Sequence, residues 1–125
     1  MTQFVMALDQ RVAGGASVDT LLNYRQIIEA GNYSVHVNLF LPEVLRHFDL
    51  PELAAGLAPR PLLLINSQDP MKRTQPEASV KQELHLASQC YQLLGASQHL
   101  RIRMTPDKES RDKVILEWFG ERSRE

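Results

Sequence analysis

The sequence has little of what several large classes of protein require. Cys90 is its single cysteine, which excludes an intrachain disulfide framework and a multi-cysteine zinc site. Fourteen basic and fifteen acidic side chains leave a formal net charge of −1, too little to attract nucleic acid or an anionic membrane. Residues 1–9 lack a signal-peptide pattern, and no apolar run approaches the roughly 18 residues of a membrane-spanning helix. We therefore expect a soluble cytoplasmic protein with no nucleic-acid or membrane partner.

Common catalytic and ligand-binding motifs are also missing. The chain has no G-x-S-x-G nucleophile elbow, and Gly14-Gly15 does not continue into a phosphate-binding loop. Ser17 lacks the flanking glycines of a nucleophile, and Cys90 has no histidine at helical spacing to form its thiolate. The histidines have no metal-ligand spacing to another histidine, cysteine or acid: they are His36, His47, His85 and His99. We expect no metal ion and no cofactor.

The chain does contain the pattern of one α/β domain, over residues 1–125. Its length and its 43% of hydrophobic residues are enough for a single core. Three apolar runs predict strands, and helical patterns alternate with them. The strands are expected at residues 12–18, 62–65 and 100–104. Right-handed crossovers then predict a three-layer α/β/α architecture, in which about three parallel strands lie between helices.

Apolar periodicity and capping residues predict the helices between the strands. Thr74 and Glu77 fit a capping box at the start of the longest helix, and Asp19 or Thr20 fits the start of an earlier one. The helices are expected at residues 21–30, 41–48, 50–57, 75–94 and 110–121. In the longest helix, five residues form one apolar stripe toward the sheet: Val80, Leu84, Ala87, Tyr91 and Leu94.

Asp69 is the residue best placed for chemistry. Ligands and catalytic groups of open parallel sheets gather at the carboxyl ends of the strands, and Asp69 follows the strand expected at residues 62–65. A second interpretation is structural, because an aspartate ahead of a proline, here Pro70, commonly forms an Asx-type turn. The segment after the last expected strand, residues 105–109, contains no histidine. Both interpretations of Asp69 stay open at this point.

Residues 50–70 read Leu-Pro-Glu-Leu-Ala-Ala-Gly-Leu-Ala-Pro-Arg-Pro-Leu-Leu-Leu-Ile-Asn-Ser-Gln-Asp-Pro. This segment resembles the acetyl-xylan-esterase and dienelactone-hydrolase-like branch of the α/β-hydrolases. Further similarity lies at residues 7–12, 32–33, 41–49 and 91–96, so the resemblance extends over nearly the whole chain. It implies that the three strands correspond to the last three strands of an α/β-hydrolase, that is, to its C-terminal half.

The resemblance places Asp69 at the position of the family's catalytic acid, which orients the catalytic histidine and stabilises its protonated form. Where the family has Gly-Gly-His-Glu, residues 105–109 read Thr-Pro-Asp-Lys-Glu, with Lys108 near the expected histidine. Lysine keeps its proton near neutral pH and is a poor general base. The family's nucleophilic serine precedes the segment that matches residues 7–12. The resemblance therefore implies a relative of serine carboxylester hydrolases that lacks the nucleophile and the catalytic histidine.

Three functional hypotheses follow. The chain is a C-terminal piece of an active serine esterase or peptidase that needs an N-terminal half, a non-catalytic hydrolase-like interaction module, or a small-molecule binding domain. The missing histidine favours the second hypothesis over the first. In the parent fold, another strand pairs with the one expected at residues 12–18. We therefore expect an open sheet edge between Val12 and Val18, covered by self-association or by a partner protein.

Overall fold

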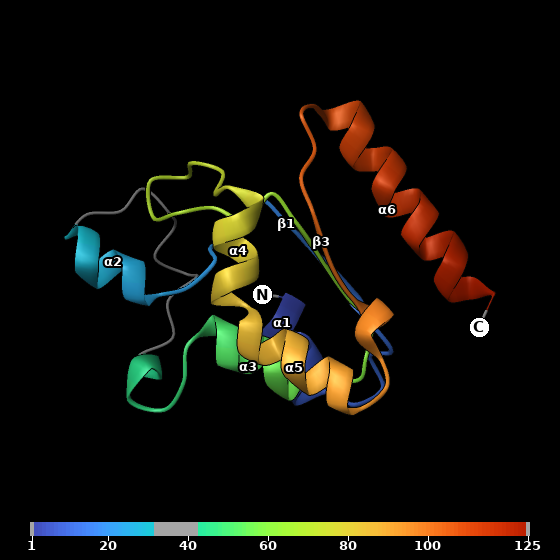
Figure 1. The fold of residues 1–125 in the computed structure, drawn as a ribbon, viewed down its shortest axis with the longest axis horizontal. Coiled ribbons are helices and arrows are strands. Elements are labelled where there is room, and N and C mark those ends of the chain that lie inside the picture. The colour runs from blue at the N-terminus through green and yellow to red at the C-terminus, as the bar shows by residue number, and fades with distance from the viewer. Residues whose placement is uncertain (1, 32–42, 125) are drawn as a thin grey trace.

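The computed structural model describes residues 2–31 and 43–124. Several positions named in the sequence analysis lie outside the described residues: Asn32, Tyr33, His36 and the start of the helix predicted over residues 41–48. Figure 1 shows the arrangement of the elements. In chain order they are α1 (Thr2–Leu8), β1 (Gly15–Val18), α2 (Arg25–Ala30), the 3-10 helix η2 (Val44–Arg46), α3 (Leu50–Gly56), β2 (Leu62–Ile65), α4 (Glu77–Glu83), α5 (His85–Leu93), the 3-10 helix η3 (Ser97–His99), β3 (Leu100–Arg103) and α6 (Lys108–Ser123).

The three strands form one parallel sheet in the order β1-β2-β3, which confirms the predicted α/β class. The middle strand, β2, is buried at all four positions. A continuous run of apolar residues suits it because both of its faces are covered by helices. The β1 strand is shorter than expected, since pairing with β2 begins only at Gly15, opposite Leu62.

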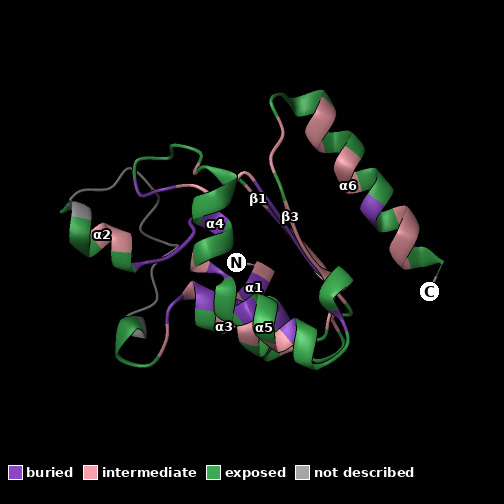
Figure 2. Cartoon of the chain, viewed as in Figure 1, coloured by how far each residue is buried: buried purple, intermediate pink, exposed green. Residues whose placement is uncertain are grey.

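Helices cover both faces of the sheet (Figure 1). On one face, Leu62 and Leu64 pack against residues of α1, α3, α4 and α5, including Met6 and Val80. On the other face, Trp118 of α6 packs against the alternate residues of β2. Figure 2 shows the difference between the two layers, because most of α6 is exposed or half-buried whereas buried residues recur through the elements of the first layer.

The helix predicted over residues 75–94 is two helices, α4 and α5. Leu84 lies between them with φ −94° and ψ 17°, and the chain changes direction there (Figure 1). Apolar periodicity could not reveal the break because no residue is inserted and Leu84 stays buried. The prediction for Leu94 was wrong, since 58% of it is exposed after the turn. The predicted Thr74 cap was also wrong, because α4 follows Pro76 without a side-chain cap.

The helix predicted over residues 21–30 begins later, and neither Asp19 nor Thr20 caps it. The preceding residues continue along the sheet instead, where the Leu22 N–H donates to the Gln68 carbonyl at 3.0 Å. The predicted stop was correct: Gly31 has φ 68°, and its N–H donates to the Ile27 carbonyl. The chain thus leaves β1 as a buried extended segment before α2 forms.

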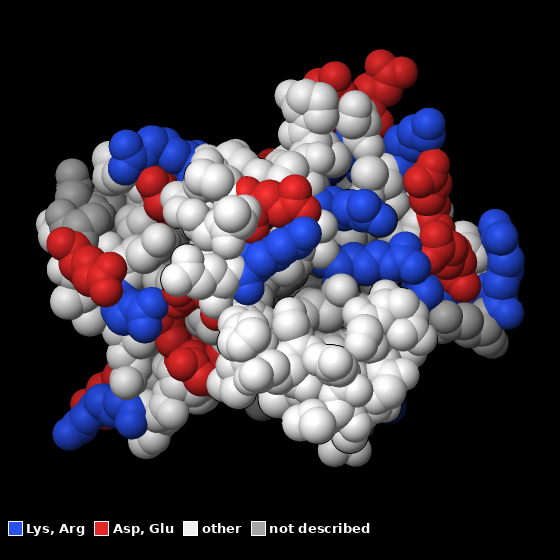
Figure 3. Space-filling model, viewed as in Figure 1, with Lys and Arg blue, Asp and Glu red and all other residues white. Residues whose placement is uncertain are grey.

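Charges of both signs are interleaved on the surface seen in Figure 3. The uncharged area at the lower centre of that view lies over α5, in agreement with the absence of Asp, Glu, Lys and Arg from residues 84–100. Within the part of the chain that the structure describes, no helix combines the length and hydropathy that crossing a membrane requires.

Candidate functional site

Asp69 lies in the loop between β2 and α4, at the carboxyl end of β2. It is 8% exposed, and both of its carboxylate oxygens accept hydrogen bonds from its own loop. Oδ1 accepts from the backbone N–H groups of Met71 and Arg73, each at 2.9 Å. Oδ2 accepts from Nε of Arg73 at 2.8 Å. The carboxylate therefore organises the turn over residues 69–73.

The electrostatics of Asp69 agree with this geometry. Burial raises the pKa of its carboxyl group, but the hydrogen bonds from Arg73 and Met71 outweigh burial and leave the pKa below its ordinary value. The group is thus held as a carboxylate with Arg73 as its counter-ion. Arg73, and not a histidine, is therefore the side chain that this carboxylate binds.

The described histidines lie elsewhere. His47 and His85 are exposed, and the ring Nδ1 of His99 lies 2.8 Å from the Pro59 carbonyl oxygen. Lys108, the residue expected near the family's histidine position, is exposed in the first turn of α6. No histidine in residues 2–31 or 43–124 forms a hydrogen bond with Asp69.

The carboxyl ends of β2 and β3 are tied to each other. The Asn66 amide donates to Thr105 Oγ1 at 2.9 Å, and its oxygen accepts the Thr105 backbone N–H at 2.8 Å. Asn66 adopts a left-handed backbone with φ 53° to make this link, a conformation that asparagine tolerates better than most residues. These two hydrogen bonds hold the segments after β2 and β3 together.

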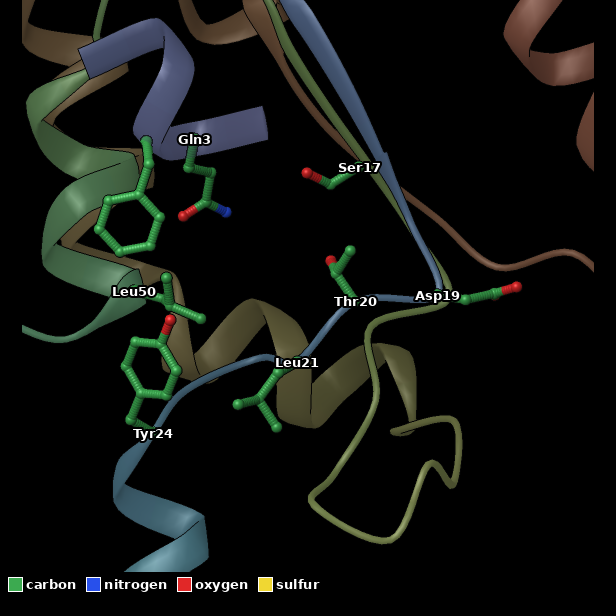
Figure 4. Close-up of a pocket in the computed structure, with 8 residues that line it drawn as sticks. Gln3, Ser17, Asp19, Thr20, Leu21, Tyr24 and Leu50 are labelled. Carbon is green, nitrogen blue, oxygen red and sulfur yellow. The ribbon is translucent and has the colours of Figure 1, made fainter. Parts of the chain in front are cut away.

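A second region lies at the carboxyl end of β1, where the structure contains a pocket of about 250 Å³ (Figure 4). Its walls come from α1, from β1 and the segment after it, and from the start of α3. The lining residues are Gln3, Phe4, Ser17, Asp19, Thr20, Leu21, Tyr24 and Leu50.

The pocket contains two buried polar side chains without partners. Gln3 is 9% exposed, and its buried Oε1 has no hydrogen-bond partner among the described residues. Ser17 is 4% exposed, and its hydroxyl likewise forms no hydrogen bond within the described part of the chain. Both side chains point into the same space in Figure 4, whereas Asp19 points away from it and forms an ion pair with Arg111 at 3.3 Å.

Close packing of α1 on β1 brings Gln3 and Ser17 together. A Cβ atom at Gly15 would lie 2.5 Å from Thr2 Cγ2 and 2.9 Å from Met6 Sδ. Only glycine therefore allows the helix to approach the strand this closely. Since side chains alternate along a strand, Ser17 shares the α1 face with Gly15.

Asp49 holds the opposite wall of the pocket. Its Oδ1 accepts the backbone N–H groups of Tyr24 and Leu50, at 2.6 and 2.7 Å, and its Oδ2 accepts that of Arg25 at 3.1 Å. Glu52 completes a capping box at the start of α3. Burial, with a smaller contribution from the Asp49 charge, raises the pKa of Tyr24. The Tyr24 phenol therefore stays protonated at neutral pH.

Sequence reasoning missed Gln3 and Asp49, and it considered Ser17 only as a nucleophile that lacks the flanking glycines. The capping role of Asp49 could have been predicted, because an aspartate three residues before Glu52 fits a capping box. The role of Gln3 could not have been predicted, since Gln3 becomes buried only through the packing of α1.

The fold and the two strand-end regions define a small α/β protein with a parallel sheet. Compared with known proteins, the chain matches no family model, no curated protein and no solved structure. The relationship to the α/β-hydrolases and the assignment of Asp69 to a catalytic position therefore stay predictions from sequence resemblance. The described residues contain no group of three or more His, Cys, Asp or Glu side chains that could hold a metal ion.

Proposed function

We propose that this chain is a non-catalytic, α/β-hydrolase-like protein of the cytoplasm. One observation carries the proposal: both carboxylate oxygens of Asp69 accept hydrogen bonds from residues 71–73. A catalytic acid accepts a histidine N–H, whereas the side chain bonded to Asp69 is that of Arg73, at 2.8 Å. In this chain Asp69 occupies the position of the family's acid and serves to shape a loop.

The lack of an activated nucleophile in the described residues supports the same proposal. Nucleophilic catalysis needs a hydroxyl or thiol within hydrogen-bond reach of a base. Ser17 has no such partner among the described residues, and His99 faces a carbonyl oxygen. The proposed cytoplasmic location rests on Cys90, which is a free thiol. A reducing compartment such as the cytoplasm keeps thiols in this state.

Hydrolysis of p-nitrophenyl acetate by the purified chain tests this proposal. We expect no turnover above the protein-free rate for the wild type, Asp69→Asn or Ser17→Ala, with circular dichroism to verify that each variant is folded. Turnover that either substitution abolishes would contradict the proposal. Turnover that survives both would place catalytic groups elsewhere and contradict it equally.

A second proposed role is interaction through the edge of β1, which within the described chain pairs only with β2. The N–H groups of Gly15 and Asp19 donate to Pro61 and Ile65, each at 3.0 Å. Backbone groups alternate in direction along a parallel pair, so those of Ala16 and Val18 point away from β2. The Ala16 carbonyl accepts the Thr2 hydroxyl at 3.3 Å, so Val18 carries the open part of this edge. An edge of this kind recruits another strand. We propose that a second copy of this chain covers it, or a partner protein such as an N-terminal hydrolase half.

Sedimentation velocity at tens of micromolar tests the second copy. Val18→Pro removes an outward N–H while the hydrogen bonds to β2 remain, and Val18→Ala is the matched control that keeps it. We expect dimers or larger species for the wild type and the control, and monomers for V18P. A strictly monomeric wild type would contradict self-association, as would a V18P variant that still associates.

A further inference from the structure

We propose that the pocket at the carboxyl end of β1 binds an uncharged aromatic molecule that carries one hydrogen-bonding head group, such as a primary carboxamide. The inference rests on Gln3, Ser17 and the walls around them. It does not depend on Asp69 or on the absence of catalysis.

Two polar side chains define the kind of head group that the pocket can bind. Gln3 and Ser17 come from different elements, α1 and β1, and both point into one cavity (Figure 4). The buried Gln3 Oε1 has no partner among the described residues, which is costly and uncommon in native structures. The Ser17 hydroxyl also forms no hydrogen bond with the described residues, but it keeps some contact with solvent. The Gln3 amide can both accept and donate, and so can the Ser17 hydroxyl. A head group with a carbonyl oxygen and an N–H complements this pair.

The charges around the pocket favour a neutral ligand. None of the eight described residues that line the pocket is a lysine or an arginine. Asp19 is the one carboxylate among these described residues, and it is turned away and paired with Arg111. A charged ligand would lose its hydration without gaining a counter-ion, which is strongly unfavourable. The pocket therefore selects for a neutral molecule.

The size and walls of the pocket suit an aromatic ring. The pocket volume is about 250 Å³, larger than the roughly 150 Å³ of an apolar cavity that holds benzene. The pocket can thus take one ring together with a small head group. Phe4 and Tyr24 supply aromatic walls, and Leu21 and Leu50 supply aliphatic ones. Aromatic walls favour an aromatic body, through edge-to-face or offset contact.

Nuclear magnetic resonance titration with benzamide tests the proposal. We expect saturable shifts of the backbone amide signals of residues 17–21, with a dissociation constant of about 1 mM or lower, as suits a fragment of this size. Benzoate and benzamidine match benzamide in shape but carry a negative and a positive charge. Each should bind at least roughly tenfold more weakly if neutrality is selected.

Gln3→Met and Ser17→Ala test the two polar contacts. Each removes hydrogen-bonding capacity with little change in shape, and each should weaken benzamide binding by roughly tenfold. Gln26→Met is the matched control, because the Gln26 Oε1 is also buried and unpartnered among the described residues but does not line the pocket. It should leave the affinity for benzamide unchanged. Ser17→Ala keeps the test decisive if Gln3→Met fails to fold.

Three results would overturn the proposal. One is the absence of saturable shifts up to the solubility limit of benzamide, as expected if water alone occupies the pocket. Another is equal binding of benzamide, benzoate and benzamidine. The third is unchanged affinity in both Gln3→Met and Ser17→Ala, which would place the ligand elsewhere. None of these results bears on the p-nitrophenyl acetate assay, so the two proposals can fail separately.

Discussion

The carboxyl ends of β1 and β2 are neighbouring positions in one sheet, yet their polar groups are in opposite states. Beside β2, the side chains of Asp69 and Asn66 are hydrogen-bonded within the protein. Beside β1, Gln3 and Ser17 are buried without partners in the described chain. Position at a strand end therefore does not by itself identify a functional residue. Hydrogen-bond satisfaction separates a carboxylate that holds a turn from groups that can receive a ligand.

The largest loss of stability is expected at Asp49, the hydrogen-bonded carboxylate beside the β1 pocket. Asp49→Ala removes the acceptor of three backbone N–H groups, so we expect the free energy of unfolding to fall by about 3–4 kcal/mol. Urea denaturation followed by circular dichroism measures this loss. Asp107→Ala is the control, because Asp107 is exposed and caps α6 through one N–H, that of Ser110. The loss for Asp107→Ala should be clearly smaller, because this cap lies in solvent and accepts a single backbone N–H. Equal losses for the two variants would refute the role of Asp49 in holding the wall of the pocket.

An intermediate effect is expected at the satisfied strand end. Asp69→Asn replaces a carboxylate with an amide that cannot form the ion pair with Arg73, and should lower the free energy of unfolding by about 2 kcal/mol. Because folding lowers the pKa of Asp69, its stabilisation is complete above the ordinary pKa of about 4. It is lost as the pH falls through the lower value of the folded state.

Denaturation between about pH 2 and 6 should therefore show a steeper acid loss of stability for the wild type than for D69N. Parallel curves for the two proteins would mean that the hydrogen bonds to Asp69 do not favour its charged form. In that case, the hydrogen bonds of Asp69 would not distinguish the end of β2 energetically from the end of β1.

The smallest effect has the opposite sign. Gln3→Met exchanges an unpartnered buried amide for an apolar chain of similar size, and should leave the melting temperature unchanged or raise it, by the equivalent of about 1 kcal/mol. Differential scanning calorimetry without added ligand gives the comparison with D69N. A loss of stability as large as that of D69N would show that Gln3 already has a structural partner.

The central and last strands were predictable from particular residues. Leu62 to Ile65 form an uninterrupted apolar run, which fits a strand covered on both faces. The break at Leu84 was not predictable, because it changes the direction of the chain without disturbing apolar periodicity. The caps proposed at Asp19 and Thr74 failed because the residues after Asp19 continue along the sheet, and Thr74 forms a bridge with Gln68.

The candidate sites were predictable only in part. The strand-end rule located Asp69, and the Asp-Pro pair raised the possibility of a turn, but nothing in the sequence assigned Arg73 to its second oxygen. The β1 pocket depends on contact between Gln3 and a strand that begins at Gly15. Such an arrangement arises from helix packing, and single-sequence patterns carry no information about it.

The order of the strands has a consequence for the synthesis of the protein. Because the spatial order β1-β2-β3 equals the chain order, each new strand can pair with one that has already left the ribosome. Among the described elements, the face of the sheet with Leu63 and Ile65 is covered only when Trp118 of α6, the last helix, packs on it. A nascent chain that has completed β3 therefore carries a formed sheet with one apolar face uncovered, which is the stage at which we expect a chaperone or premature aggregation to act on it.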